Sequence, residues 1–336
     1  MTAAGSSSCF AAIHLQISAV PPPVGEDNHR MQTPLEKNEE KRATLAAVGS
    51  ILLWCASGVC FARGARLLGP MAYLTLMTAT GVITAVLLQY FRGQPLADLV
   101  RLPGRVVVAG FWGVAFYTVI LALAFGIAPE RDIGQVNLLN YLWPVWIALL
   151  SAVLIPEKTR RLPTAAGILL GFAGIVVARG PAEILRAPEN PLPLLLALLG
   201  GFLWACYSVL LRRWRIPAEQ GGTAFHFTVC ALMAAAVAAI RGEWQELPIV
   251  GAEALFWILF GGIGPVGLAY SWWEIGVKRG HLPLISALAY FIPVGSTVLL
   301  GLLFREAMGP GLLFGAVLIA AGAWLAGQAQ RPTVKS

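Results

Sequence analysis

Ten long stretches of uncharged, strongly apolar residues constrain this chain more than any other feature of its sequence. They lie at residues 43–62, 67–91, 106–129, 133–156, 162–178, 190–211, 220–240, 254–273, 280–304 and 307–330. A helix of about 20 apolar residues is needed to cross about 30 Å of hydrocarbon, and each stretch approaches or exceeds that length. The sequence therefore predicts an all-α membrane protein with ten transmembrane helices.

The composition agrees with a lipid environment for most of the chain. Hydrophobic residues make up 57% of the sequence and charged residues 12%, whereas soluble domains have about 45–50% and about 25%. The first 42 residues differ, because they include a Ser-rich segment and three consecutive prolines and lack the basic start and compact apolar centre of a secretory signal. We expect residues 1–42 to form a disordered cytoplasmic tail and residues 331–336 to form a short second tail.

The positions of the basic residues predict the orientation of the chain in the membrane. Of the 24 Lys and Arg residues, 17, including every lysine, fall in one alternate set of segments between the apolar stretches or at the two ends. Cytoplasmic segments carry such an excess, so we expect both termini to lie in the cytoplasm. This asymmetry accounts for the formal net charge of +7, and the charge therefore does not indicate a nucleic-acid partner.

The two halves of the chain match each other at an offset near 150 residues. The matched pairs are LWCASGV at 53–59 with LWACYSV at 203–209, YLWPV at 141–145 with YFIPV at 290–294, and GILLGFAG at 167–174 with GAVLIAAG at 315–322. Because each copy would hold five helices, an odd number, the second copy must enter the membrane in the opposite orientation. Inverted repeats of this kind are typical of secondary transporters. We predict two five-helix repeats, at 43–181 and 182–330.

The stretch at 133–156 contains polar and helix-breaking residues where lipid-facing residues would be expected. At helical spacing, one face of its predicted helix gathers Asn137, Asn140, Tyr141 and Pro144. The related face in the second half carries Tyr290 and Pro293. Polar faces persist in membranes where they border a protein interior or a wet cavity. We predict that both faces line a shared central cavity and that the prolines act as paired gates; alternatively, each polar side chain bonds a neighbouring helix.

Other candidates for substrate binding are aromatic residues deep within the remaining apolar stretches. They are Trp54, Tyr117, Trp204, Tyr207, Tyr270 and Trp273. Aromatic rings supply an apolar wall and π faces that attract an ammonium group. Two ionisable residues, Glu274 and His226, are candidates for proton coupling, because proton-coupled carriers usually keep such a group inside the membrane. The alternatives are a local ion pair of Glu274 with Lys278 and a packing role for His226.

Four motifs resemble those of the drug/metabolite transporter superfamily in its EamA-domain branch, and within it the YddG-type aromatic amino acid exporters. They are NYLWP at 140–144, FLWACYS at 202–208, GLAYSWWEIGVKRGH at 267–281 and AYFIP at 289–293, and the likeness covers residues 43–330. The resemblance implies a multi-pass protein of the bacterial inner membrane that exports aromatic and other largely neutral amino acids to the periplasm. It also implies a central cavity between the two halves. We expect alternating access, no cofactor or metal, and function as a monomer.

Three other classes of protein fit the sequence less well than an amino acid exporter does. A membrane-embedded enzyme needs a nucleophile and base or a metal cluster, and the four scattered histidines have no such spacing. A channel usually has a repeated filter or a ring of charges, which an inverted repeat does not provide. The alternative function is export of another small metabolite or a cationic drug. A cation carrier would need a buried carboxylate, and a sugar-nucleotide carrier would need basic residues inside the membrane; neither is evident in the helix centres.

Overall fold

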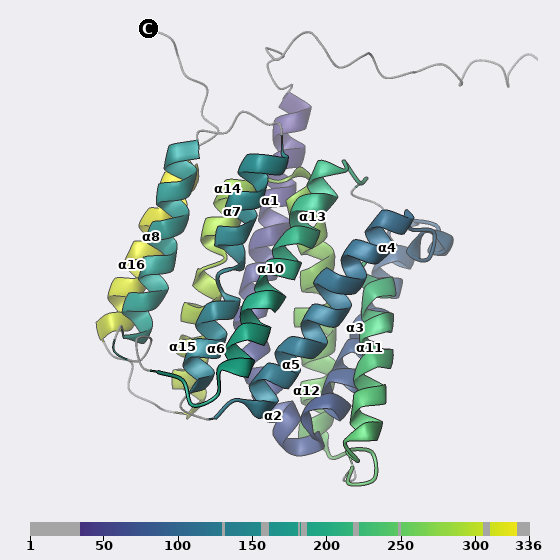
Figure 1. Ribbon diagram of the computed structural model, residues 1–336. Helices are drawn as coiled ribbons and strands as arrows, with labels where there is room; N and C mark the ends of the chain where they lie inside the picture. Colours follow the sequence, from purple (N-terminus) through teal and green to yellow (C-terminus); the bar gives the residue numbers. More distant parts are fainter. Residues whose placement is uncertain are drawn as a thin grey trace, which may run out of the picture.

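The computed structural model describes residues 34–129, 132–155, 161–180, 182, 187–217, 222–247, 250–304 and 310–327. Within this part of the chain every regular element is a helix, and no residue is in a β-strand. Figure 1 shows the helices packed side by side, with α1 (Pro34–Cys55) beginning at the upper end of the bundle. We call this end the N-terminal face and the other end the opposite face. The predicted all-α class is confirmed.

Six helical stretches are long and apolar enough to cross a membrane. They are Pro34–Leu68, Pro70–Phe91, Gly104–Ile127, Pro191–Arg213, Thr223–Ile240 and Ala252–Arg279. Shorter apolar helices of 10–17 residues lie at Trp143–Leu154, Leu162–Ala178, Leu282–Ser296 and Phe314–Ala326. These lengths agree with a membrane protein, whereas the crossing of the membrane by ten helices stays a prediction.

The first predicted helix is longer than expected and is interrupted once. It begins at Pro34, so residues 34–42 are helical and the expectation of disorder there is wrong, while residues 1–33 lie outside the described part. After the interruption, α2 (Ser57–Leu68) leads to Gly69, whose φ of +82° permits a sharp turn into α3 (Pro70–Phe91). A side chain at this position would be strained, because L-residues rarely adopt a positive φ.

Two of the long stretches contain a segment of π-helix at corresponding places. In the first half, η2 (Phe111–Phe116) joins α4 (Gly104–Gly110) to α5 (Tyr117–Ile127). In the second half, η4 (Gly262–Leu268) joins α12 (Ala252–Gly261) to α13 (Ala269–Arg279) and contains Pro265. π-Helical turns release backbone groups from the regular ladder and are frequent at functional sites. The separation of η2 and η4 along the sequence is close to the offset near 150 residues that relates the two sequence repeats.

The predicted proline-containing helices are each divided into two. The first consists of α6 (Ile133–Asn140) and α7 (Trp143–Leu154), and the second of α14 (Leu282–Leu288) and α15 (Phe291–Phe304). Tyr141 and Tyr290 occupy the turns between the parts, and Pro144 and Pro293 follow within the next helical turn. Proline has no N–H to donate to the residue four positions earlier. The position of each break therefore follows from the proline downstream of it.

The remaining helices complete the bundle. They are α8 (Arg161–Arg179), α10 (Pro191–Arg213), α11 (Thr223–Ile240), α16 (Pro310–Gly327) and the short η1 (Leu96–Leu99). α8 packs along α16 at one side of the bundle (Figure 1). A Cβ on Gly167 would lie 2.5 Å from the carbonyl oxygen of Gly322, so the small residues in both helices permit this close approach.

Candidate functional site

A cavity of about 690 Å³ extends from the middle of the bundle to the opposite face. At its outer end it is lined by Arg66 near the end of α2, Pro70 at the start of α3 and Gly126 near the end of α5. Figure 1 shows α2 at the lower end of the bundle, away from the start of α1. Six of the predicted binding residues line the cavity: Trp54, Tyr117, Asn140, Tyr141, Trp204 and Tyr270.

Four of these side chains form a cluster at the inner end of the cavity, which we call the aromatic floor: Trp54, Tyr117, Trp204 and Tyr270. They come from α1, α5, α10 and α13, so helices of both halves contribute. The ring of Tyr270 lies edge-on to Trp54 at 5.1 Å and to Trp204 at 5.2 Å, and Tyr117 stacks on Trp204 at 6.0 Å between centroids. Such arrangements are favourable for aromatic pairs.

The π-helical segment η4 helps to hold the aromatic floor in place. The indole Nε1–H of Trp54 donates a hydrogen bond of 2.9 Å to the carbonyl oxygen of Pro265, which lies within η4. A buried indole N–H normally needs such an acceptor. Trp54 is thereby fixed to the second half of the chain although it belongs to the first.

Polar atoms also face the cavity. Ser57, Thr118 and Ser296 line it, and each hydroxyl donates to a backbone carbonyl, at 2.7 Å in all three cases. A hydroxyl that donates in this way keeps its lone pairs for a ligand's N–H groups. Asn140 is 6% exposed, and its Oδ1 has no hydrogen-bond partner among the described residues. The wall therefore offers acceptors but has no acidic side chain among the residues that line the cavity.

Three predicted binding residues are buried outside the cavity lining. Tyr207 and Trp273 lie behind the aromatic floor: Tyr207 donates its hydroxyl to Glu274 at 2.9 Å, and Trp273 donates its Nε1–H to Ser208 at 3.2 Å. Tyr290 packs against α8, where a Cβ on Gly171 would meet its ring at 2.5 Å. None of the three lines the cavity, so the prediction that Tyr290 shares it with Tyr141 does not match the geometry.

Three further residues of the predicted site do not line the cavity or have side chains outside the described part. The side chain of Asn137 lies outside the described part, so its predicted role stays a prediction. Pro144 and Pro293 are buried beside the helix breaks and do not line the cavity. Their predicted effect on gating would therefore act through the backbone.

Glu274 is the centre of a buried polar cluster between the aromatic floor and the N-terminal face. One carboxylate oxygen accepts hydrogen bonds from Tyr207 at 2.9 Å and Thr223 at 3.1 Å. The other accepts the backbone N–H of Gly222 at 3.0 Å and lies 3.6 Å from Nζ of Lys278. The side chains of Glu274 and Lys278 are only 4% and 2% exposed. The ion pair of Glu274 with Lys278, the alternative to proton coupling, is therefore present within α13. The cluster as a whole joins α10, the start of α11 and α13.

His226 lies beside this cluster. Its ring is 5.6 Å from that of Tyr207, and the residue is fully buried. A Cβ on Gly110 would lie 2.0 Å from Nε2, and one on Gly222 would lie 2.4 Å from Cε1. Both glycines are thus needed to admit the imidazole. Neither ring nitrogen has a hydrogen-bond partner within the described residues.

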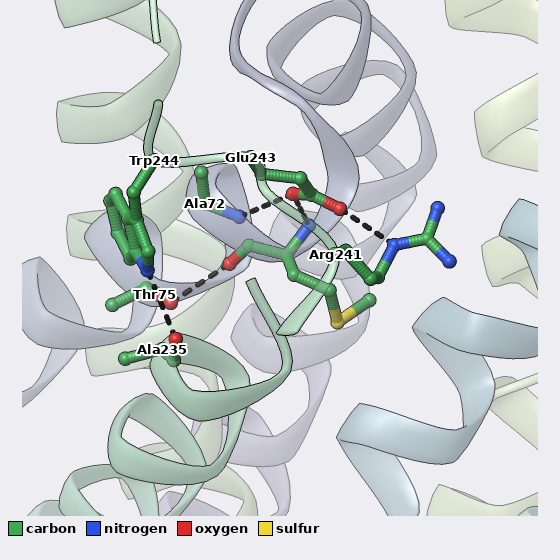
Figure 2. A network of polar contacts seen from close by, with 7 residues as sticks. Ala72, Thr75, Ala235, Arg241, Glu243 and Trp244 are labelled. Carbon is green, nitrogen blue, oxygen red and sulfur yellow. Dashed lines mark hydrogen bonds and ion pairs between the residues drawn. The ribbon is translucent and has the colours of Figure 1, made fainter. Parts of the chain in front are cut away.

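A second carboxylate, Glu243, lies next to the outer end of the cavity. Figure 2 shows that it joins the segment after α11 to the start of α3. One oxygen accepts the backbone N–H groups of Met71 and Ala72 at 2.8 and 2.9 Å, and the other lies 2.9 Å from Nε of Arg241. A carboxylate at a helix N-terminus is favoured because it pairs with N–H groups that have no partner within the helix. Pro70, which lines the cavity, is the first residue of that helix.

Sequence reasoning missed several residues that line the cavity. Trp143 follows Tyr141 in the NYLWP motif, and its ring also contacts Trp273 at 5.2 Å. Its place in that motif was a signal that could have identified it. Phe125 and Phe227 also line the cavity, but an isolated phenylalanine in an apolar helix looks the same whether it faces lipid, protein or a cavity.

Comparisons with known proteins agree with this arrangement. The model of the EamA-like transporter family matches residues 41–180 and 191–328. The aromatic amino acid exporter YddG of Ancylobacter novellus is 36% identical over 84% of this chain and 96% of its own length. YddG of Salmonella typhimurium is 29% identical, over 85% and 98% respectively. A solved crystal structure with 32% identity superposes with a TM-score of 0.74, covering 86% of this chain and 99% of that one.

Proposed function

The chain belongs to the EamA-like transporter family, and from this premise we propose that it exports aromatic and other largely neutral amino acids across the bacterial inner membrane. The observation that carries the proposal is the cavity of about 690 Å³ with its aromatic floor. The substrate's ring would lie on that floor, and its ammonium group would meet Oδ1 of Asn140 and the π faces. Relatives named as aromatic amino acid exporters support the same substrate class.

The alternative substrates fit the cavity less well. A cationic drug would gain from a carboxylate in the wall, and no Asp or Glu lines the cavity within the part of the chain that the structure describes. A sugar nucleotide carries several negative charges and would need a cluster of basic residues. Among the described residues, Arg66 at the outer end is the only Lys or Arg in the lining. A zwitterion needs neither feature, because its own charges offset each other.

We further propose alternating access between two inverted repeats, residues 43–181 and 182–330, with ten membrane crossings and both termini in the cytoplasm. With that orientation the cavity opens to the periplasm, and the Glu274 cluster closes the cytoplasmic side. The cluster would have to separate before substrate could reach the floor from the cytoplasm. The helix breaks before Pro144 and Pro293 are the proposed points of bending. Function as a monomer is part of the proposal, because the cavity is built from one chain.

Proton coupling is proposed to act through Glu274 with His226. The ionisable groups that face Glu274 are the amine of Lys278 and, across Tyr207, the imidazole of His226. A proton taken up by the carboxylate would remove its attraction for Lys278 and weaken the closed cytoplasmic side. Replacing Glu274 with glutamine should therefore abolish any dependence of transport on a pH gradient.

The direct test is transport of labelled tryptophan by the purified protein in liposomes. We expect saturable transport of tryptophan and phenylalanine, inhibited by other neutral amino acids, and a faster rate when a pH gradient is imposed. Spermidine serves as the cationic control and should neither be carried nor compete. Carriage of spermidine without carriage of tryptophan would contradict the proposed substrate.

The orientation has its own test. Val100 and Gln245 are exposed residues at the two ends of the bundle. A cysteine at position 245 should react with an impermeant thiol reagent added to intact cells, whereas one at position 100 should react only after permeabilisation. The reverse pattern would place the termini in the periplasm and invert the proposed direction of export.

The gating role of the prolines is tested by kinetics. If Pro144 and Pro293 permit bending, Pro144→Ala and Pro293→Ala should slow turnover while leaving the Kd for tryptophan unchanged. Pro103, which precedes α4 outside the helix breaks, provides the control variant Pro103→Ala. Turnover that is unaffected in both test variants would remove the prolines from the mechanism.

A further inference from the structure

A second cavity, of about 200 Å³, lies between α7, α8 and α14. Figure 1 shows α7 and α14 in the upper half of the bundle, nearer the N-terminal face than α6 and α15. Most of its wall is apolar, with residues such as Ala148, Ile155 and Ile168. An apolar cavity of about 150 Å³ is enough to hold benzene, so this space accommodates the side chain of an aromatic amino acid.

Two serines in the lining of this cavity have hydroxyl groups without hydrogen-bond partners in the described part of the chain. Ser286 on α14 is 2% exposed, and Ser151 on α7 has a buried hydroxyl. A buried hydroxyl is normally hydrogen-bonded, because its transfer from water is otherwise unfavourable. Unpartnered hydroxyls beside the cavity therefore point to an occupant that brings polar groups of its own.

One charged residue also lines the second cavity. Arg212, near the end of α10, donates from Nη1 to the carbonyl oxygens of Gly280 at 2.7 Å and Val277 at 3.4 Å. These contacts hold the guanidinium beside the cavity at the end of α13. A guanidinium suits a carboxylate, since its planar fork matches the two oxygens. The cavity thus combines an apolar chamber, a cation and two hydroxyls.

The two cavities share the same pair of divided helices. On one wall, Trp143 lines the first cavity and Val145 the second. On the other wall, Ile292 lines the first and Ser286 the second, on either side of the break at Tyr290. Tyr290 lies in the intervening layer, packed on Gly171 of α8. The second cavity therefore borders the same divided helices as the first and lies nearer the N-terminal face.

We propose that this second cavity is a binding site for the same class of amino acid, occupied before the substrate reaches the aromatic floor. The side chain lies between α7 and α8, the carboxylate pairs with Arg212, and the ammonium donates to Ser151 and Ser286. The proposal rests on the proposed export of amino acids. The competing occupant is a lipid chain, because Leu149 and Leu169 at the rim are 54% and 60% exposed.

The test measures protection of a probe placed in the second cavity. Ala148→Cys introduces a thiol into its wall, and the rate of modification by a small methanethiosulfonate reagent is measured on the full-length protein in lipid nanodiscs. The rate for the unsubstituted protein, which has its own cysteines, is subtracted. Saturating tryptophan should slow modification about tenfold, as expected from the fraction of occupied sites at about ten times Kd. Exchanging the acyl chains of the nanodisc lipid should leave the rate unchanged.

Background variants identify the source of the protection. Trp204→Ala weakens the first cavity, and protection of the probe by tryptophan should persist in this variant. If Trp204→Ala does not fold, Asn140→Ala is used in its place. Arg212→Gln should abolish protection. The matched control is Arg213→Gln, because Arg213 is the exposed neighbour that does not line the cavity.

Three further outcomes overturn the second site, and a fourth overturns the proposed function. Protection that disappears in the Trp204→Ala background would arise from the first cavity. Slowing by lipid exchange but not by tryptophan would identify a lipid chain as the occupant. Absence of protection while the same preparation carries tryptophan in liposomes would refute the second site and leave the proposed function intact. Failure of the wild-type protein to carry any amino acid would instead refute the proposed function.

Discussion

The two ends of the bundle use the same chemical contact with different consequences. At the N-terminal face, Glu274 accepts the backbone N–H of Gly222, just before α11. At the opposite face, Glu243 accepts the N–H groups of Met71 and Ala72, at the start of α3. In both cases a carboxylate from a distant segment satisfies the free donors of a helix start. One end is nevertheless closed over the aromatic floor, whereas the other borders an open cavity.

The difference lies in the charged partner and its burial. Glu274 pairs with Lys278, which is 2% exposed, whereas Glu243 pairs with Arg241, which is 43% exposed. Water can replace an exposed guanidinium as the partner of a carboxylate at little cost, but a buried charge that loses its partner has nothing to replace it. The comparison indicates that opening the N-terminal face requires a change in charge or an entering ligand, whereas the opposite face can rearrange with water alone.

The largest expected effect is on the buried pair. Glu274→Gln removes the carboxylate that lies 3.6 Å from the buried ammonium of Lys278, and loss of one partner of such a pair costs about 3–5 kcal/mol. We expect a corresponding fall in the thermal stability of the purified protein, measured by the loss of native fluorescence in detergent. Tryptophan export should fall as well, because the N-terminal face is no longer held closed.

A double variant provides the control for this prediction. Glu274→Gln combined with Lys278→Met removes both charges, and much of the lost stability should return, because no unpaired charge remains. If the stability losses of the single variants Glu274→Gln and Lys278→Met simply add up in the double variant, the two charges do not interact. The distinction between the two faces would then have to be abandoned.

The second-largest effect should differ between the two divided helices. Tyr141 lines the cavity, whereas Tyr290 is packed against α8. Tyr141→Ala should weaken tryptophan binding by about 1–3 kcal/mol, the range for removing a buried aromatic contact, and should weaken threonine binding less. Tyr290→Ala should lower thermal stability without changing the order of preferred substrates.

Isothermal titration and thermal unfolding, measured on the same two variants, distinguish a role in substrate binding from a role in helix packing. An equal proportional loss of affinity for all substrates in Tyr141→Ala would contradict its place in the binding surface. A change of substrate preference in Tyr290→Ala would show that this residue reaches substrate in another state of the transporter.

The smallest effect is expected at the opposite face. Glu243→Gln keeps an oxygen that can accept from the start of α3 but removes the charge, so we expect a loss of about 1 kcal/mol, as for a weakened helix cap. Arg241→Gln should cost less, because exposed ion pairs contribute about 0–1 kcal/mol. Both losses should shrink at high salt. A loss in Glu243→Gln as large as that in Glu274→Gln would erase the contrast between the two faces.

The sequence predicted the membrane class and much of the cavity wall. Trp54, Tyr117 and Trp204 could be identified because large aromatic residues deep in apolar stretches of the two halves indicated a shared interior. Asn140 could be identified because an amide is expensive in lipid. Glu274 was correctly paired with Lys278, since residues four apart are neighbours on any helix. These predictions depend on properties that hold within one helix or one repeat.

Other features depended on contacts between helices far apart in sequence. Periodicity places Tyr141 and Tyr290 on related faces, but it does not say which neighbouring helix each face meets. The bond of Tyr207 to Glu274 joins residues 67 positions apart, and that of Trp54 to Pro265 joins residues 211 apart. The second cavity exists only because α7, α8 and α14 leave a space between them. Local hydrophobicity and helix geometry thus determined which segments enter the membrane and where they break, whereas packing between distant helices decided which side chains face the cavity, because a helix rotated by a single residue presents a face about 100° away.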